Sequence, residues 1–402
     1  MISRRAFVCG TAALGGTLSM PADAHQSVRV NELLDRAMDG IDPKRFIDAH
    51  NHVVGVGHGG SGCAVHPSMT DGIRHPLNWV RFHAYARASG IESMDAIDQE
   101  YMDKLKERVE GMPHAGTHLL FAFDRVYTES GIPDADHTVF YVPNDHMLRA
   151  VAMSERFAAC ASIHPFRPDA IDELHRMADA GAVAIKWLPN AMWIDPADPR
   201  CIPFYEAMVA RQLTLISHGG EEQAVPSPHT QEYGNPLRLR LPLQVGVQVV
   251  VAHCASFGKS RDLDHPTAEP VPSFELFLRL MDEPSWQRNL YGELSAVLLF
   301  NRVRGVVDTL LRRTDLHPRL IHGSDYPIPG IDPLINLVQL WSLGLIRWSD
   351  RAPLAHLFHQ NPLLGDFALK RVLTVDGGPP VGFPPNIFCP DDAVFPRLTR
   401  PA

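Results

Sequence analysis

The chain has 402 residues and is 45% hydrophobic, so it can bury a substantial core as one large domain or two. Its formal net charge of -9 at pH 7, with no compensating basic block, argues against a nucleic-acid partner. No apolar run beyond the N-terminus is long enough to span a bilayer.

The first 24 residues have the pattern of an export signal. Residues 3–8 (Ser-Arg-Arg-Ala-Phe-Val) resemble the twin-arginine motif, a mild apolar stretch follows to Met20, and residues 22–24 offer a small-x-small cleavage site. Cys9 lacks the preceding small residue of a lipoprotein site, so we expect no membrane anchor. The pattern predicts export by the twin-arginine machinery to the periplasm or the exterior. A frayed amphipathic N-terminus is the alternative interpretation.

Residues 25–45 are predicted to form a helix and a linker that lead into the first strand. Asp42-Pro43 ends the helix, and residues 45–50 form the strand-like run that carries His50, with His52 two residues further on. Strand side chains alternate between faces, so His50 and His52 point the same way and can hold one ion.

A helical insert is predicted after this strand, at about residues 55–115. Residues 76–111 have the pattern of two amphipathic helices rich in aromatic and charged side chains. An insert at this point of a barrel lies over the active-site mouth, so we expect it to act as a lid. Residues 55–60 match Gly-x-Gly-x-x-Gly, but no helix start follows them, and we interpret them as a flexible loop.

Strand-like runs and helical patterns alternate along the rest of the chain. The strand candidates end near Phe123, His164, Leu188, His218, His253, Ser295 and Asp325. The helical patterns between them include residues 169–180, 203–211, 273–281 and 303–312. With the strand before His50, this makes eight βα units and predicts an α/β fold of the (β/α)8 TIM-barrel type over residues 46–373.

A doubly wound open sheet is the structural alternative. It would place ligands at one switch point rather than around the whole set of strands. The Pro-rich tail, residues 374–402, is expected to wrap along the barrel or to be poorly ordered.

Six candidate metal-binding or catalytic side chains lie at the ends of the strand-like runs. They are His50, His52, Lys186, His218, His253 and Asp325. Imidazole and carboxylate ligands suit a divalent ion of the Zn, Mn, Fe or Ni type. The active site of a (β/α)8 barrel lies at the carboxyl ends of its strands, so we expect all six around one site.

With these motifs the chain resembles the amidohydrolase superfamily, and more closely its amidohydrolase-related (amidohydrolase 2) branch of metal-dependent hydrolases. The resemblance covers about residues 46–373 and rests on Asp-x-His-x-His at residues 48–52, the three strand-end residues Lys186, His218 and His253, and Gly-Ser-Asp-x-Pro at residues 323–327. It implies one or two divalent ions, with zinc as the first choice and manganese or another ion as the alternative. It also implies that Asp325 binds metal and accepts a proton from metal-activated water. For His253 it implies binding of a second metal or polarisation of the substrate carbonyl.

Lys186 has more than one interpretation. Desolvation at a barrel mouth lowers the pKa of a lysine and gives the neutral amine that reacts with carbon dioxide. The resemblance to binuclear members then implies a carboxylated Lys186 that bridges two ions. A cation for a substrate carboxylate and a snorkelling side chain are the alternatives. Asp48, expected on the face of His50, either orients a metal ligand or is a buried structural carboxylate.

Four further residues are candidates for lining a substrate pocket, although each also has a structural explanation. They are His164, Asp124, Arg125 and Glu293, near the ends of the third, second and seventh strands.

The sequence therefore predicts an exported, metal-dependent hydrolase that attacks an amide, lactone or ester carbonyl of a small molecule with metal-activated water. A non-oxidative decarboxylase or a hydratase on the same scaffold is the alternative. The decarboxylase-like members of the branch generally lack the strand-four lysine, which favours hydrolysis. A non-catalytic exported binding protein is the second alternative. The sequence leaves open the substrate, the number of ions and assembly into a homo-oligomer.

Overall fold

The structure of the protein is a computed structural model that describes residues 22–114, 116–227 and 229–398. The twin-arginine motif predicted at residues 3–8 lies outside these described residues. Among the helices that the structure describes, none combines the length and apolar character that a membrane span requires.

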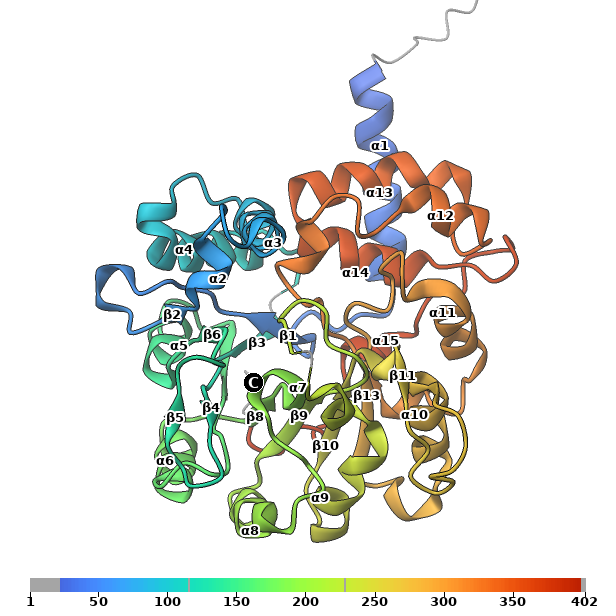
Figure 1. The fold of residues 1–402 in the computed structure, drawn as a ribbon. Helices are drawn as coiled ribbons and strands as arrows, with labels where there is room; N and C mark the ends of the chain where they lie inside the picture. Colours follow the sequence, from blue (N-terminus) through green and yellow to red (C-terminus); the bar gives the residue numbers. More distant parts are fainter. Residues whose placement is uncertain (1–21, 115, 228, 399–402) are drawn as a thin grey trace, which may run out of the picture.

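Eight parallel strands form one sheet at the centre of the molecule (Figure 1). In spatial order they are β1 (Ile47–His52), β3 (Thr117–Phe121), β7 (Phe157–Ala161), β8 (Ala184–Trp187), β9 (Thr214–His218), β10 (Val249–Ala252), β13 (Leu290–Glu293) and β14 (Leu320–Ile321). This order follows the chain, and each strand pairs in parallel with the next. Every strand end predicted from the sequence coincides with the end of one of these strands or with the residues just after it.

The sheet closes into a barrel where β14 meets β1. The backbone N–H of Ala49 donates to the carbonyl of His322 at 3.0 Å, and the N–H of Asp325 donates to the carbonyl of His50 at 2.9 Å. Asn51 forms a parallel bridge with Tyr326. This closure confirms the predicted (β/α)8 barrel and excludes the open doubly wound sheet, which has two free edges.

Helices cover the outside of the barrel. They include α5 (Asn144–Val151), α6 (Ala170–Asp179), α8 (Ile202–Ala210), α9 (Arg240–Val245), α10 (Ser273–Asp282), α11 (Val303–Arg312) and α14 (Pro362–Val372). In α6, the apolar residues Ala170, Leu174 and Met177 are buried while Asp172 is exposed, which is the spacing of one helix face packed on the sheet. Strands covered in this way are buried on both faces, so β10 is a continuous apolar run.

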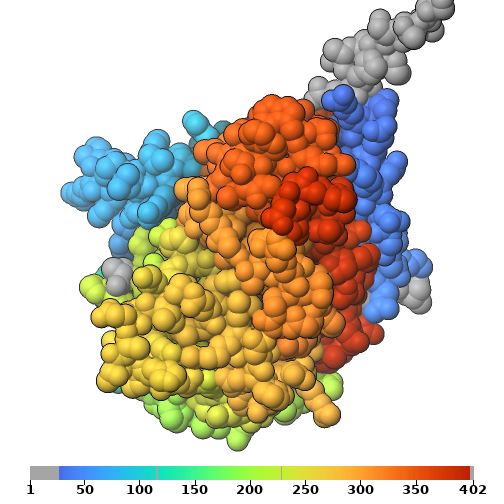
Figure 2. All heavy atoms as spheres, turned by 90° about the vertical axis from the view of Figure 1, so that its right-hand side faces the viewer, coloured from blue at the N-terminus to red at the C-terminus, as the bar shows by residue number. Residues whose placement is uncertain are grey.

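The insert between β1 and β3 forms a separate lobe beside the mouth of the barrel (Figure 1). It contains α2 (Pro67–Thr70), α3 (Pro76–Ala88) and α4 (Ile97–Glu110). Figure 2 shows part of this lobe standing out from the barrel in the turned view. The Gly-rich loop before α2 is held by the chain itself, because Asp98 of α4 accepts the backbone N–H groups of Val56 at 2.7 Å and Gly57 at 3.0 Å. These amides are therefore satisfied without a phosphate ligand.

The N-terminal helix α1 (Ala22–Met38) lies along α13 (Trp348–Gln360) and α14, as Figures 1 and 2 show. It starts three residues before the predicted segment and ends before Asp42.

The Pro-rich tail wraps around the barrel, which is one of its two predicted conformations. It contains the short helix α15 (Pro385–Phe388), and Val394 and Phe395 join the apolar cluster inside the barrel. The hydroxyl of Thr214, at the amino end of β9, donates to the carbonyl of Val394 at 2.6 Å. The tail therefore closes the end of the barrel opposite the mouth.

Candidate metal centre

A cavity of about 430 Å³ lies at the carboxyl ends of the strands. Its lining includes all six of the predicted strand-end residues, which are His50, His52, Lys186, His218, His253 and Asp325. They come from β1, β8, β9 and the residues that follow β10 and β14, so the barrel brings together side chains up to 275 positions apart in the sequence (325 − 50). The expectation that they share one site agrees with their placement in the structure.

The innermost part of the cavity contains His50, His253 and Asp325. One ligand atom from each of these buried residues lies within 4.8 Å of the others. Asp325 Oδ1 is 3.3 Å from His50 Nε2 and 3.0 Å from His52 Nε2, so one carboxylate lies between the two imidazoles of β1. Spacing of this kind, with two imidazoles and a carboxylate, fits a divalent ion.

The His50 imidazole is oriented for metal binding. Its Nδ1 lies 2.9 Å from Glu293 Oε2, while its Nε2 is buried and has no hydrogen-bond partner. With Nδ1–H donating to Glu293, the lone pair of Nε2 points toward Asp325. Burial, followed by the charge of Lys186, lowers the pKa of His50 well below its usual value, which keeps the ring neutral as a metal ligand requires. A buried, unpaired ring nitrogen is what a metal ligand leaves when the metal is removed.

His253 and Asp325 are both held in the left-handed backbone region, with φ values of 59° and 64°. Such conformations are strained for residues other than glycine and persist where the surrounding structure imposes them. His253 Nδ1 lies 2.6 Å from Ser295 Oγ, which leaves Nε2 as the ring nitrogen available to the cavity. Burial, followed by the charge of Arg302, lowers the pKa of His253 well below its usual value.

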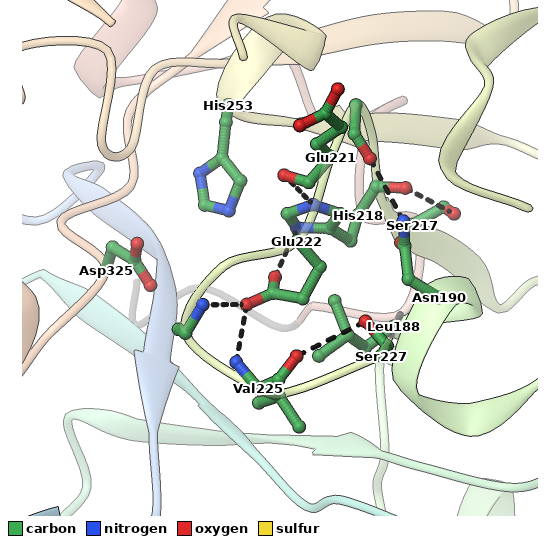
Figure 3. A network of polar contacts seen from close by, with 12 residues as sticks. Leu188, Asn190, Ser217, His218, Glu221, Glu222, Val225, Ser227, His253 and Asp325 are labelled. Carbon is green, nitrogen blue, oxygen red and sulfur yellow. Dashed lines mark hydrogen bonds and ion pairs between the residues drawn. The ribbon is translucent and has the colours of Figure 1, made fainter. Parts of the chain in front are cut away.

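His218 lies beside Glu222, a residue that no sequence motif indicated. His218 Nδ1 is 3.4 Å from Glu222 Oε2, and the His218 and His253 ring centres are 5.1 Å apart. Glu222 accepts the backbone N–H groups of Ala224 at 2.5 Å and Val225 at 2.8 Å, so its carboxylate is turned back onto its own loop (Figure 3). Figure 3 also shows His253 and Asp325 facing the same space.

Lys186 is buried in the wall of the cavity. Its ammonium lies over the ring of Phe121, with Nζ 5.0 Å from the ring centre, and only 4% of the residue is exposed. No ion pair to its ammonium is found in the part of the chain that the structure describes. Burial lowers the pKa of Lys186, which favours the neutral amine that carboxylation needs.

The four weaker candidates do not line this cavity, and their role in binding substrate stays a prediction. His164 is fully buried, with Nε2 3.0 Å from the carbonyl of Met192. Asp124 pairs with Arg167 at 3.2 Å, and the guanidinium of Arg125 lies 3.9 Å from the ring centre of Tyr141.

Glu293 is the fourth of these candidates, and it lies beneath the metal ligands instead. It is fully buried, where it contacts His50 and the hydroxyl of Ser295. Burial raises the pKa of Glu293 to about 7. Its role is to orient His50.

Asp48 also differs from its expected placement, because a bulge shifts the register of β1 between Asp48 and Asn51. Its carboxylate lies 3.5 Å from His118 Nδ1 and accepts the backbone N–H of Ser324 at 2.8 Å. Asp48 is therefore a buried structural carboxylate, the second of its two interpretations.

The insert and the long loops supply most of the remaining lining, and sequence reasoning named none of these residues. Tyr101 of α4 donates its hydroxyl to the carbonyl of His52 at 2.7 Å, and Tyr85 of α3 donates to the carbonyl of Ala224 at 3.3 Å. The basic residues of the lining include Arg81 and Arg302. The amphipathic pattern of α3 and α4 could have indicated Arg81, Tyr85 and Tyr101. No motif marks a single loop residue such as Arg302.

No family model matches the chain, and no curated protein matches it. Among solved structures, the chain is similar to an uncharacterised TIM-barrel protein from Bordetella bronchiseptica, with 16% identity, a TM-score of 0.47 and coverage of 80% of this chain and 99% of that chain. It is also similar to a protein from Staphylococcus aureus assigned as an amidohydrolase (13% identity, TM-score 0.42, 73% of this chain and 92% of that chain). A third is 5-carboxyvanillate decarboxylase from Sphingomonas paucimobilis (16% identity, TM-score 0.38, 78% and 99%). The fold assignment rests on the strand order and closure of the barrel described above.

Replacing Glu293 tests its role beneath His50. Glu293→Gln keeps the size of the side chain but removes the charge that orients the Nδ1–H, so we expect affinity for zinc or manganese to fall about 10–100-fold. Competition with a chromophoric chelator measures this affinity. Glu275→Gln, on the exposed face of α10, is the matched control. Equal metal affinity in both variants would show that Glu293 does not orient a ligand.

Proposed function

We propose that the chain is a metal-dependent hydrolase of the amidohydrolase type that cleaves an amide, lactone or ester bond of a small molecule. The observation that carries the proposal is that all six predicted strand-end residues line a single cavity. Packing alone does not require such a set, because buried imidazoles and a carboxylate are costly without partners. The exposed rim and apolar walls are those of a small-molecule site.

The residues fit a divalent ion. His50, His253 and Asp325 would hold it, with His52 beside Asp325, and His218 and Lys186 would complete a second position. When bound, such an ion lowers the pKa of a water molecule and polarises a carbonyl group.

The side chains of the cavity have separate tasks in hydrolysis. Asp325 is placed to accept a proton at its carboxylate and to pass it to the leaving nitrogen or oxygen. His253, with Nδ1 held by Ser295, has Nε2 alone available, and the lone pair of this nitrogen would bind the ion. The hydroxyl of water adds to the carbonyl carbon, the bond to the leaving group breaks, and that group takes up the proton. Tyr85 and Tyr101 of the insert line the cavity, where the insert would limit access of bulk water.

A non-oxidative decarboxylase or a hydratase is the second candidate. In such a reaction the charged form of Lys186 would hold a carboxylate of the substrate. The two candidates differ in their products, because decarboxylation releases carbon dioxide and hydrolysis releases an acid with an amine or alcohol. A screen of metal-loaded enzyme against lactones, amides and aromatic carboxylates, with both products measured, separates them.

The ligand assignment predicts the metal content. We expect the purified protein to hold one or two divalent ions per chain and His50→Ala/His52→Ala to lose most of this metal, because both imidazoles contact Asp325. Elemental analysis after mild purification measures the content. His359→Ala, on the exposed end of α13, is the control. Equal metal content in the double variant and the wild type would refute the assignment.

Lys186→Ala separates one-ion from two-ion chemistry. If a carboxylated Lys186 bridges two ions, the variant loses one metal equivalent and most activity, and short-chain carboxylic acids partly restore both. If Lys186 binds a substrate carboxylate as a cation, metal content stays constant and KM rises. Lys259→Ala, at an exposed position, is the control. An unmodified Lys186 beside a single fully occupied ion in a crystal structure would exclude the bridge.

We propose in addition that the protein is exported by the twin-arginine machinery, on the basis of residues 3–8. Arg4→Lys/Arg5→Lys is expected to leave unprocessed protein in the cytoplasm, since the paired arginines are what that machinery recognises. Immunoblots of cytoplasmic and periplasmic fractions measure the distribution, with Arg29→Lys as the control. Unchanged periplasmic delivery of the double variant would contradict this route.

A further inference from the structure

Arg302 is a cation of the cavity that the proposed hydrolysis does not use. It lies between β13 and α11 and lines the same cavity as the metal ligands. Its Nη1 is 3.4 Å from Ser256 Oγ, and its guanidinium carbon is 5.4 Å from the ring centre of Phe257. Its Nε is buried and has no hydrogen-bond partner. Among the residues that the structure describes, no carboxylate lies within 4.0 Å of its nitrogens.

The acidic groups that act on Arg302 are engaged elsewhere. Glu222 and Asp325 are the two whose charges reach it. Glu222 accepts two backbone N–H groups and contacts His218, and Asp325 contacts His50 and His52. Arg302 is half-buried and stays charged, and a partly desolvated charge without an acidic partner is unfavourable. The position of Arg302 therefore indicates a ligand that supplies the missing anion.

The free end of the guanidinium matches a carboxylate. With Nη1 directed to Ser256 and Nε buried, Nη2 is the nitrogen that remains to donate to a carboxylate oxygen, and the positive charge of the guanidinium strengthens that contact. A neutral ligand would leave the charge of Arg302 unpaired.

Much of the lining of the cavity that contains Arg302 is apolar. Leu299 and Phe300 come from the same loop, and Phe82, Phe123 and Phe140 come from α3 and the segments after β3. Arg81 of α3, which is exposed, also reaches the lining and adds a second positive charge at the mouth. The cavity thus combines an apolar wall with cations and, once loaded with metal, carries an excess of positive charge.

We infer that Arg302 binds the carboxylate of an amphipathic acid substrate, whose apolar body packs on the aromatic wall and whose reacting carbonyl lies at the metal ligands. The position of the reacting bond rests on the proposed function, whereas the binding of the carboxylate does not need catalysis. The substrate class is therefore an acid with an apolar body and a second, hydrolysable carbonyl group.

Paired probes of equal shape test the inference. Isothermal titration of metal-loaded, full-length protein with 4-phenylbutyrate and with its neutral amide, 4-phenylbutyramide, gives two dissociation constants. We expect the acid to bind at least about tenfold more tightly, because charge-assisted hydrogen bonds are stronger than neutral ones. In Arg302→Met the affinity for the acid falls to that for the amide, which changes little. Arg304→Met, exposed and outside the lining, keeps the preference of the wild type.

The outcomes separate Arg302 from the metal. Wild-type protein that shows no preference for the acid overturns the inference, whatever the variants do. A preference that survives in Arg302→Met, or in the second variant Arg302→Gln if the first does not fold, also overturns it. A preference that disappears in His50→Ala/His52→Ala but persists in Arg302→Met assigns the carboxylate to the metal, and this result also overturns the inference. Unchanged metal content in that double variant refutes the proposed function alone, and the Arg302 result stands.

Discussion

The geometry of the candidate site depends on the seam where β1 meets β14. Asp48 accepts the backbone N–H of Ser324 at 2.8 Å and that of His50 at 3.2 Å, so one buried carboxylate ties together the two segments that carry metal ligands. Burial opposes ionisation of Asp48, but the His118 imidazole 3.5 Å away and the nearby His322 hold its pKa well below its usual range. The carboxylate therefore stays charged and keeps its two amide bonds. The 3.3 Å approach of His50 to Asp325 follows from this arrangement.

A second layer supports the seam from outside the barrel. Lys370 of α14 is fully buried, donates to the carbonyl of Gly323 at 2.7 Å and pairs with Asp366 at 2.6 Å. This ammonium fixes the main chain two residues before Asp325, while Glu293 fixes the ring of His50. A buried pair of this kind adds little stability by itself but defines one arrangement of the groups around it. The helix at the end of the barrel thus contributes to the site although none of its residues lines the cavity.

The fold and the six strand-end residues could be predicted from the sequence because both depend on local patterns. Apolar runs end in polar side chains at regular intervals, and a parallel barrel gathers those ends on one side. The bulge in β1 has no such signal, so the alternation rule placed Asp48 on the wrong face. Glu222 and Arg302 lie in irregular loops whose paths are set by tertiary packing, and no periodicity marks them. The sequence placed Glu293 at the correct strand end. Its contact with His50 arises only when the sheet closes, so no local pattern could indicate it.

The closure of the barrel by Val394 and Phe395 has a consequence for the order in which the protein is completed. All eight strands leave the ribosome before these residues, so the barrel interior stays open at its amino end until the tail is synthesised. All eight strands can therefore pair before this end of the barrel is covered, and the covering step is the docking of a short segment rather than the pairing of a strand.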